Sequence, residues 1–261
     1  MGEHILYMVD RSVATITINR PRAYNAFNSE TLSKMTEAFH AAGGDRNVGV
    51  IVLTGAGDKA FCAGGDVNWE KEGGLVDGQA EHEMKVLYES MRATLKPVIA
   101  RINGYCIGGG HHLAYFCDLS IAADHAIFGQ NGPRVASPAQ GWLVSYLVRV
   151  VGAKRAREMW MLCRRYPAAK ALEWGLVNAV VSPEELDAEV RKWCDEILAL
   201  SPTALKVLKR SFDEEYSSLR EAQDNHDFLD EINPDFYKDG EQQEGAAAFL
   251  EKRIPDFSRW R

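Results

Sequence analysis

Two glycine-rich segments are the part of this sequence whose residue types and spacing could do chemistry. They read FCAGGD over 61–66 and NGYCIGGG over 103–110. Glycine permits a positive φ and lets a ligand approach the main chain closely, and a helix N-terminus adds free N–H donors and a positive dipole end. Two such loops side by side could aim two N–H groups at one oxygen, as an oxyanion hole requires. The alternative is that both segments are only tight turns.

The sequence does not contain the residue spacings that are typical of nucleotide or metal sites. The GGG run matches neither GxGxxG nor a P-loop, which argues against a nucleotide site of either type. His111 and His112 are adjacent, so they lack the i, i+4 spacing and the third ligand of a metal site. The five cysteines are odd in number and contain no CxxC pair, which indicates unpaired thiols in a reducing compartment. We therefore expect no bound metal.

The elements that must position the glycine segments follow from hydrophobic patterning. Residues 13–18 alternate like a strand, and the apolar runs at 48–54 and 97–102 are typical of strands buried on both faces of a parallel sheet. Helices are expected at 29–42, which Ser29 can cap, at 83–95 and at 111–116, with a polar, mobile loop over 66–82. Further helical segments are predicted at 142–151, 153–163, 167–173, 183–200 and 202–224. The pattern predicts an α/β fold with right-handed βαβ units and a helical C-terminal region.

Composition limits the kinds of partner. The 261 residues carry a formal net charge of −7, which disfavours a nucleic-acid-binding role. The N-terminus lacks a signal-peptide pattern, and no apolar run is long enough to span a membrane. We expect a soluble cytoplasmic protein with a small-molecule ligand, without a nucleic acid or membrane partner.

Several motifs together resemble one protein family over essentially the whole chain. They are FCAGGD (61–66), NGYCIGGG (103–110), CDLSIAAD (117–124), AIFGQ (126–130), GLVNAVV (175–181) and SPTALKVLKRSF (201–212). In this order they resemble the crotonase, or enoyl-CoA hydratase/isomerase, superfamily. GQNGPRV (129–135) and the terminus FLEKRIPDFSRWR (249–261) are most similar to the branch of 1,4-dihydroxy-2-naphthoyl-CoA synthase and 2-ketocyclohexanecarboxyl-CoA hydrolase.

The resemblance implies a ClpP-like spiral of ββα units, with a crotonase core over 1–200 and a helical trimerisation region over 201–261. It implies a homotrimer or homohexamer, and coenzyme A as part of the substrate rather than a tightly bound cofactor. The thioester carbonyl would lie between the N–H groups of Gly65 and Gly109. The residues implied along the CoA path are Ala23, Tyr24, Ala63, Asp66, Val67 and Asn131, with Lys252 reaching the CoA of a neighbouring subunit.

The sequence departs from the family at its acids. The two glutamates of the hydratases fall on His112 and Gly132, and the aspartate of the synthase branch falls on Ala139. Three features of the branch remain. The first is Ser137, and the second is Tyr237, which matches a tyrosine that reaches an adjacent subunit's site. The third is the segment at Gln130 and Gly132, where some synthases hold bicarbonate as an external base.

Each of these residues has an alternative interpretation. Ser137 could cap a helix, Tyr237 could be an interface residue, His112 could be a core imidazole rather than a catalytic one, and Asp66 could stabilise its loop.

Three hypotheses follow. The first is hydrolytic opening of an alicyclic β-oxoacyl-CoA ring through a thioester enolate. The second is hydration or isomerisation of an enoyl-CoA, cyclic or not, by groups other than glutamate. The third is a CoA-binding relative without catalytic activity, which the missing carboxylates motivate.

Overall fold

The computed structural model describes residues 3–74, 79–221 and 227–260. Two sheets form its centre. The larger has strand order β1-β2-β3-β5-β7-β10, parallel throughout except for the β1–β2 pair, and the smaller has order β4-β6-β8-β9, parallel except for β8–β9. The strands are β1 (Ile5–Asp10), β2 (Val13–Ile18), β3 (Val50–Gly55), β4 (Ala60–Cys62), β5 (Val98–Ile102), β6 (Tyr105–Ile107), β7 (Leu119–Ala123), β8 (Ile127–Gly129), β9 (Arg165–Pro167) and β10 (Ala179–Val181).

Successive strand pairs build the two sheets together. β3 and β4, then β5 and β6, then β7 and β8 each give one strand to the larger sheet and the next to the smaller, with a helix after each pair. This is the spiral of ββα units that the family resemblance implied. The helices are η1 (Pro21–Ala23), α1 (Ser29–Gly44), α2 (Val67–Trp69), η2 (Glu70–Gly74), α3 (Gln79–Ala93), α4 (Gly109–Phe116), α5 (Gly132–Val135), α6 (Trp142–Val151), α7 (Ala153–Leu162), α8 (Ala168–Glu173), α9 (Leu186–Leu198), α10 (Pro202–Glu221), α11 (Phe228–Ile232), α12 (Glu241–Leu250) and η4 (Ser258–Trp260).

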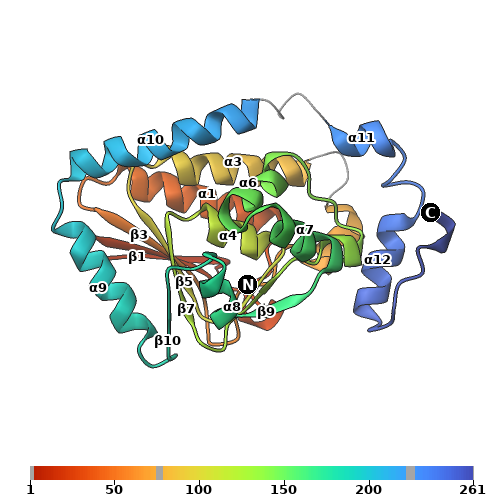
Figure 1. Ribbon diagram of the computed structural model, residues 1–261, viewed down its shortest axis with the longest axis horizontal. Helices are drawn as coiled ribbons and strands as arrows, with labels where there is room; N and C mark the ends of the chain where they lie inside the picture. Colours follow the sequence, from red (N-terminus) through yellow and green to blue (C-terminus); the bar gives the residue numbers. More distant parts are fainter. Residues whose placement is uncertain (1–2, 75–78, 222–226, 261) are drawn as a thin grey trace.

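The central strands of the larger sheet, such as β3, are buried on both faces because their side chains point alternately into two apolar clusters, whereas the edge strand β1 is largely exposed. Ile51 and Leu53 of β3 belong to the main core with the helices α1, α3 and α4, whereas Val50 and Val52 pack toward Leu186 and its neighbours on α9. This explains why the apolar run of β3 is continuous. Figure 1 shows α9 set apart from the other helices and α10 running along α3, with α12 at the far end of the molecule.

The helices and strands predicted within the described residues are present, with two corrections, while residues 222–224 of the helix predicted at 202–224 lie outside the described part. Asn28, not Ser29, caps α1: its side chain accepts from the Thr31 N–H at 3.1 Å. The stretch expected as a polar loop over 66–82 contains helical turns at α2 and η2 and the start of α3, while residues 75–78 lie outside the described part. Asp66 begins this helical stretch because its carboxylate accepts from the Asn68 N–H. Within the described ranges, no helix has the length and apolar character needed to cross a bilayer.

Candidate active site

The two glycine segments meet in space. Gly64 has φ of +97°, and a Cβ placed on it would lie 3.1 Å from the backbone nitrogen of Gly109. Gly108, with φ of +56°, makes the turn from β6 into α4 and donates its N–H to the Gly129 carbonyl at 3.0 Å. The side-by-side arrangement predicted for the glycine loops is therefore present.

The amides of Gly65 and Gly109 are both available to a ligand. Gly65 forms a parallel bridge with Phe27, in which the Phe27 N–H donates to Gly64 and the Asp66 N–H donates to Phe27. This pattern turns the N–H of Gly65 away from Phe27. Gly109 is the first residue of α4, where N–H groups have no partner within the helix. Among the described residues, neither amide donates to a protein acceptor.

A cavity of about 290 Å³ borders both glycines. It contains most of the residues implicated by sequence: Ala23, Tyr24, Ala63, Gly65, Asp66, Val67, Gly109, His112, Asn131, Ser137 and Tyr237. Gln130, Gly132 and Ala139 line it as well. Lys252 is the exception, because it lies at a second cavity that shares Asn131 and Phe249 with the first. The remaining lining is largely apolar, including Trp69, Met84, Leu143 and Leu250, and suits an acyl group.

Glu70 is the residue that sequence reasoning missed. It begins η2, lines the cavity and is only 6% exposed. Its carboxylate lies against Gly65, since a Cβ on Gly65 would overlap Glu70 Oε1. Gln242 of α12 donates to the Glu70 carbonyl at 3.0 Å and so ties the helical turn to the C-terminal region. In the sequence, Glu70 stands among polar residues with no spacing that singles it out, and this stretch was predicted to be a loop.

The environment of Glu70 suits proton transfer near neutral pH. Burial raises the pKa of its carboxyl to about 7, and the charge of Asp66 acts in the same direction. The Ser137 hydroxyl donates to Oε1 at 3.4 Å and opposes the rise. Ser137 therefore holds the carboxylate, which neither of its sequence-based interpretations included. A buried carboxyl with a pKa near the working pH both accepts and donates a proton readily.

Tyr237 lines the cavity of its own chain. The family resemblance implied a tyrosine that reaches an adjacent subunit's site, but here the segment between α11 and α12 folds back onto the same subunit. Leu229, Phe249 and Leu250 from this C-terminal region line the cavity with it. One chain thus supplies the Gly65 and Gly109 amides, Glu70 and a phenol to a single cavity.

His112, Trp160 and Gln130 form a second polar part of the same cavity lining. His112 is 3% exposed, and its ring lies 5.4 Å from that of Trp160. Burial lowers the pKa of His112 to about 4, so the imidazole is neutral at pH 7. Both ring nitrogens of His112, Nε1 of Trp160 and Oε1 of Gln130 are buried without a hydrogen-bond partner in the described structure. These atoms could bind a small polar ligand, but a neutral His112 is a poor substitute for the missing glutamate.

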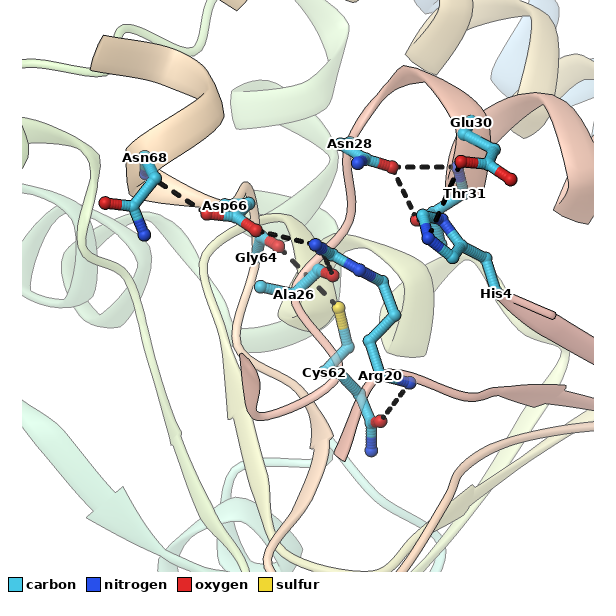
Figure 2. Close-up of polar contacts among 11 residues, drawn as sticks. His4, Arg20, Ala26, Asn28, Glu30, Thr31, Cys62, Gly64, Asp66 and Asn68 are labelled. Atoms are coloured by element: carbon cyan, nitrogen blue, oxygen red, sulfur yellow. Dashed lines mark hydrogen bonds and ion pairs between the residues drawn. The ribbon is translucent and has the colours of Figure 1, made fainter. Parts of the chain in front are cut away.

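Asp66 is held by an ion pair rather than directed only at a ligand. Figure 2 shows Arg20 and Asp66 pointing toward one another, with Nη2 of Arg20 2.8 Å from Oδ2 of Asp66. Arg20 also donates to the Ala26 carbonyl, next to Phe27. The Asp66 carboxylate thus has two protein partners, Arg20 and the Asn68 N–H, while the residue still lines the cavity.

Comparisons with known proteins show the family and the fold of the chain. The sequence model described as enoyl-CoA hydratase/isomerase matches residues 9–259. An enoyl-CoA hydratase from Mycobacterium avium subsp. paratuberculosis K-10 is similar at 27% identity and a TM-score of 0.84, covering 98% of both chains. An enoyl-CoA hydratase/isomerase from Xanthobacter autotrophicus Py2 has 31% identity and a TM-score of 0.80, over 97% of this chain and 99% of its own. A monofunctional enoyl CoA isomerase from M. smegmatis has 28% identity and a TM-score of 0.72, over 83% and 95%.

Proposed function

The chain belongs to the enoyl-CoA hydratase/isomerase family, and from this premise we propose that it hydrolyses the ring of an alicyclic β-oxoacyl-CoA through a thioester enolate. Its family membership supports an acyl-CoA enzyme of the crotonase type. The observation that carries the enolate chemistry is Glu70, a buried carboxyl beside Gly65 with a pKa of about 7. It supplies one proton-transfer group to a site that lacks acids at His112, Gly132 and Ala139. The choice of ring hydrolysis rests on the similarity of GQNGPRV (129–135) and of the C-terminal segment 249–261 to the branch that contains the ring-opening hydrolase.

One carboxyl is enough for this reaction. Glu70 accepts a proton from water, the water oxygen bonds to the ring carbonyl carbon, and the bond from that carbon to the α-carbon breaks. The electron pair passes into the thioester, whose enolate oxygen accepts from the N–H groups of Gly65 and Gly109. Glu70 then returns its proton to the α-carbon. One water is consumed, and the product is an open-chain acyl-CoA with a terminal carboxyl group.

The other polar groups have supporting roles in this proposal. The Tyr237 hydroxyl donates to the ring carbonyl oxygen as negative charge develops there, and Ser137 orients Glu70. Ala23, Tyr24, Ala63, Asp66, Val67 and Asn131 border the path of the CoA moiety. Lys252, at the second cavity, would contact the CoA of a neighbouring subunit. The CoA is part of the substrate and is not a resident cofactor.

The test is turnover of 2-oxocyclohexanecarboxyl-CoA to pimeloyl-CoA, followed by mass spectrometry. Glu70→Gln should lower kcat roughly 10²- to 10⁴-fold, the usual contribution of a general acid–base group. Glu72→Gln is the matched control, because Glu72 is an exposed carboxylate in the same helical turn. Full activity of Glu70→Gln would contradict the assigned role, and no turnover by the wild type would remove this substrate.

A second candidate reaction is hydration or isomerisation of an enoyl-CoA. The similarity to hydratases and to an isomerase favours it, and Glu70 could move a proton to and from the α-carbon in either reaction. Loss of ultraviolet absorbance from crotonyl-CoA or a cyclic dienoyl-CoA would support this candidate. If the protein binds acyl-CoA but exchanges no α-proton in D₂O, it is a CoA-binding relative without enolate chemistry.

Bicarbonate is proposed as an additional ligand near Gln130 and Gly132. Its oxygens can accept from Trp160 Nε1 and from the neutral His112, and its hydroxyl can donate to Gln130 Oε1. The buried, unpartnered atoms at these positions fit such an ion. When bound, bicarbonate would supply a second proton acceptor. Adding it to CO₂-free buffer should raise the Tm of the wild type, and this rise should be lost in Trp160→Phe.

The assembly proposed for this chain is a homotrimer or homohexamer. Large apolar side chains exposed on the single subunit are consistent with further burial: Phe212 is 73% exposed, Ile232 83% and Ile254 90%. Light scattering should give a mass three or six times 29.1 kDa. A monomer at micromolar concentration would contradict this proposal.

A further inference from the structure

Asp66 connects the two parts of the site that must cooperate. Its N–H donates to the Phe27 carbonyl at 2.8 Å, which fixes the strand-like bridge containing Gly65. Its own carbonyl accepts from the Glu70 N–H at 2.9 Å, and its carboxylate caps α2, the turn that leads to Glu70. A displacement of Asp66 would therefore move both the oxyanion amide and the proton-transfer group.

Arg20 fixes Asp66 from the opposite side. The pair is mostly shielded from solvent, with side-chain exposures of 18% for Arg20 and 15% for Asp66. Arg20 is itself anchored, because its N–H donates to Asn25 Oδ1 at 3.0 Å, and Asn25 Nδ2 donates to the carbonyls of Ala56 and Ala60. The contacts in Figure 2 form a connection from the turn after β2 to the first glycine loop. An ion pair that is shielded from solvent and whose backbone is held by hydrogen bonds fixes the positions of its residues more firmly than an exposed pair does.

We propose that Arg20 and Asp66 are a positioning pair that holds the Gly65 amide and Glu70 in register and sets the proton affinity of Glu70 through their opposite charges. This inference rests on the proposed function of Glu70. Neither residue needs to touch the reacting atoms. Asp66 places a negative charge near the Glu70 carboxyl, and Arg20 partly neutralises that charge.

The remaining surroundings of Glu70 contain few other charges. Ser137 and Gln242 present neutral groups to it, from the segment after α5 and from α12. His112 of α4 and Tyr237 line the same cavity, and burial keeps His112 neutral near pH 7. Lys71 and Glu72 follow it in η2 and are exposed, and Glu244 of α12 is bonded to Arg253. Among the described residues, the charge of Asp66 raises the pKa of Glu70 in the same direction as burial does.

The experiment measures deuterium incorporation at the α-carbon of cyclohexanecarboxyl-CoA as a function of pH. This probe forms an enolate but has no β-oxo group to cleave. In the wild type, exchange should rise with pH as Glu70 ionises near pH 7. Asp66→Asn should move this rise to lower pH, and Arg20→Gln, which leaves Asp66 unneutralised, should move it to higher pH, each by roughly half a unit or more. The maximal rate should fall roughly ten- to hundredfold in both variants, because the site loses register.

Opposite shifts distinguish this role from a structural one, since simple loss of folding would reduce the rate in both variants without separating their pH profiles. The double variant Arg20→Gln/Asp66→Asn should return the profile close to that of the wild type while keeping the low rate. Asp10→Asn removes an exposed aspartate–arginine pair with Arg11 and is the control expected to change nothing. If Asp66→Asn does not fold, Arg20→Gln and Arg20→Lys still test the direction of the shift.

The outcomes separate the two proposals. If Glu70→Gln retains exchange with an unchanged profile, the function assigned to Glu70 is wrong. If Glu70→Gln abolishes exchange but the Asp66 and Arg20 variants shift in the same direction or not at all, the positioning pair is refuted while the proposed function stands.

Discussion

At the residue scale, several glycines of the site are required by what lies beside them. A Cβ on Gly65 would overlap the Glu70 carboxylate, one on Gly109 would overlap the Phe27 ring, and one on Gly110 would overlap the Cys62 carbonyl. None of these three has a positive φ. Their role is to allow close approach, which lets two chain segments and a carboxyl share a small volume.

Gly109→Ala should therefore lower activity more than it lowers stability. The methyl group would push Phe27 or the start of α4 away and disturb the bridge that orients the Gly65 amide. Loss of one oxyanion donor typically costs about 10²- to 10³-fold in kcat. The measurement is the α-proton exchange rate, with Tm determined in parallel. Gly44→Ala is the control, because a Cβ there meets no atom within 4 Å and a helical alanine should leave exchange intact.

At the element scale, the buried Lys209 fixes α10 to the α/β core. Its Nζ donates to the carbonyls of Met91 and Lys96 and to Asp118 Oδ2, the last two at 2.8 Å. Asp118 in turn accepts from the Val98 N–H at the start of β5. One side chain thus connects the end of α3, the start of β5 and the turn before β7 to the C-terminal region. Figure 1 shows α10 running along α3.

Lys209→Met should lower the free energy of unfolding by about 2 to 4 kcal/mol, because it leaves a shielded carboxylate and two carbonyls without their cation. The measurement is urea unfolding monitored by circular dichroism. Arg210→Met, the next residue, removes only an exposed pair with Glu214 at 3.7 Å and should cost less than about 0.5 kcal/mol. Equal effects of the two substitutions would show that the buried contacts do not stabilise the docking of α10.

The accuracy of sequence-based prediction differs between elements for physical reasons. The apolar runs of β3 and β5 and the helical spacing of α6 predict those elements closely, since each is long enough to show its period. The strands of the smaller sheet are three residues long and adjoin glycines or turns, so they show no period of their own. Glu70 was missed for a related reason: its importance depends on burial against Gly65 and α12, which local spacing does not encode.

At the scale of the whole molecule, the spiral explains why distant segments form one site. Each turn places the end of a short strand of the smaller sheet beside the previous one, so the glycines after β4 and β6 stack. The C-terminal helices then close the cavity, with Gln242 of α12 bonded to the Glu70 carbonyl. The family resemblance predicted this architecture, and the residues that it implied line the cavity, with Lys252 as the exception. It did not predict that Tyr237 would line the cavity of its own chain.

The buried Glu70 should also be visible in the stability of the whole protein. Its pKa in the folded state, about 7, exceeds the ordinary value of 4.5, so the native state binds the extra proton between these values. The stabilisation of the folded state by the protonated Glu70 is present in full below pH 4.5 and is lost as the pH rises through 7. Glu70→Gln stays neutral, so its Tm should rise above that of the wild type between pH 4.5 and 7 and stay higher above pH 7. The corresponding difference in unfolding free energy should reach up to about 3 kcal/mol.

Glu244 of α12 should show the opposite pH dependence in the same measurement, because its pKa is lowered rather than raised. The Arg253 guanidinium lowers the pKa of Glu244 to about 2, so its stabilisation is present above pH 4.5 and is lost as pH falls toward 2. Glu244→Gln should therefore lose Tm relative to the wild type at pH 7, and this deficit should shrink in acid. Thermal unfolding of both variants across pH 3 to 9 gives two curves of opposite slope. A flat Tm difference for Glu70→Gln would mean that Glu70 ionises at its ordinary pKa, and the carboxyl would then be poorly suited to return a proton to the enolate.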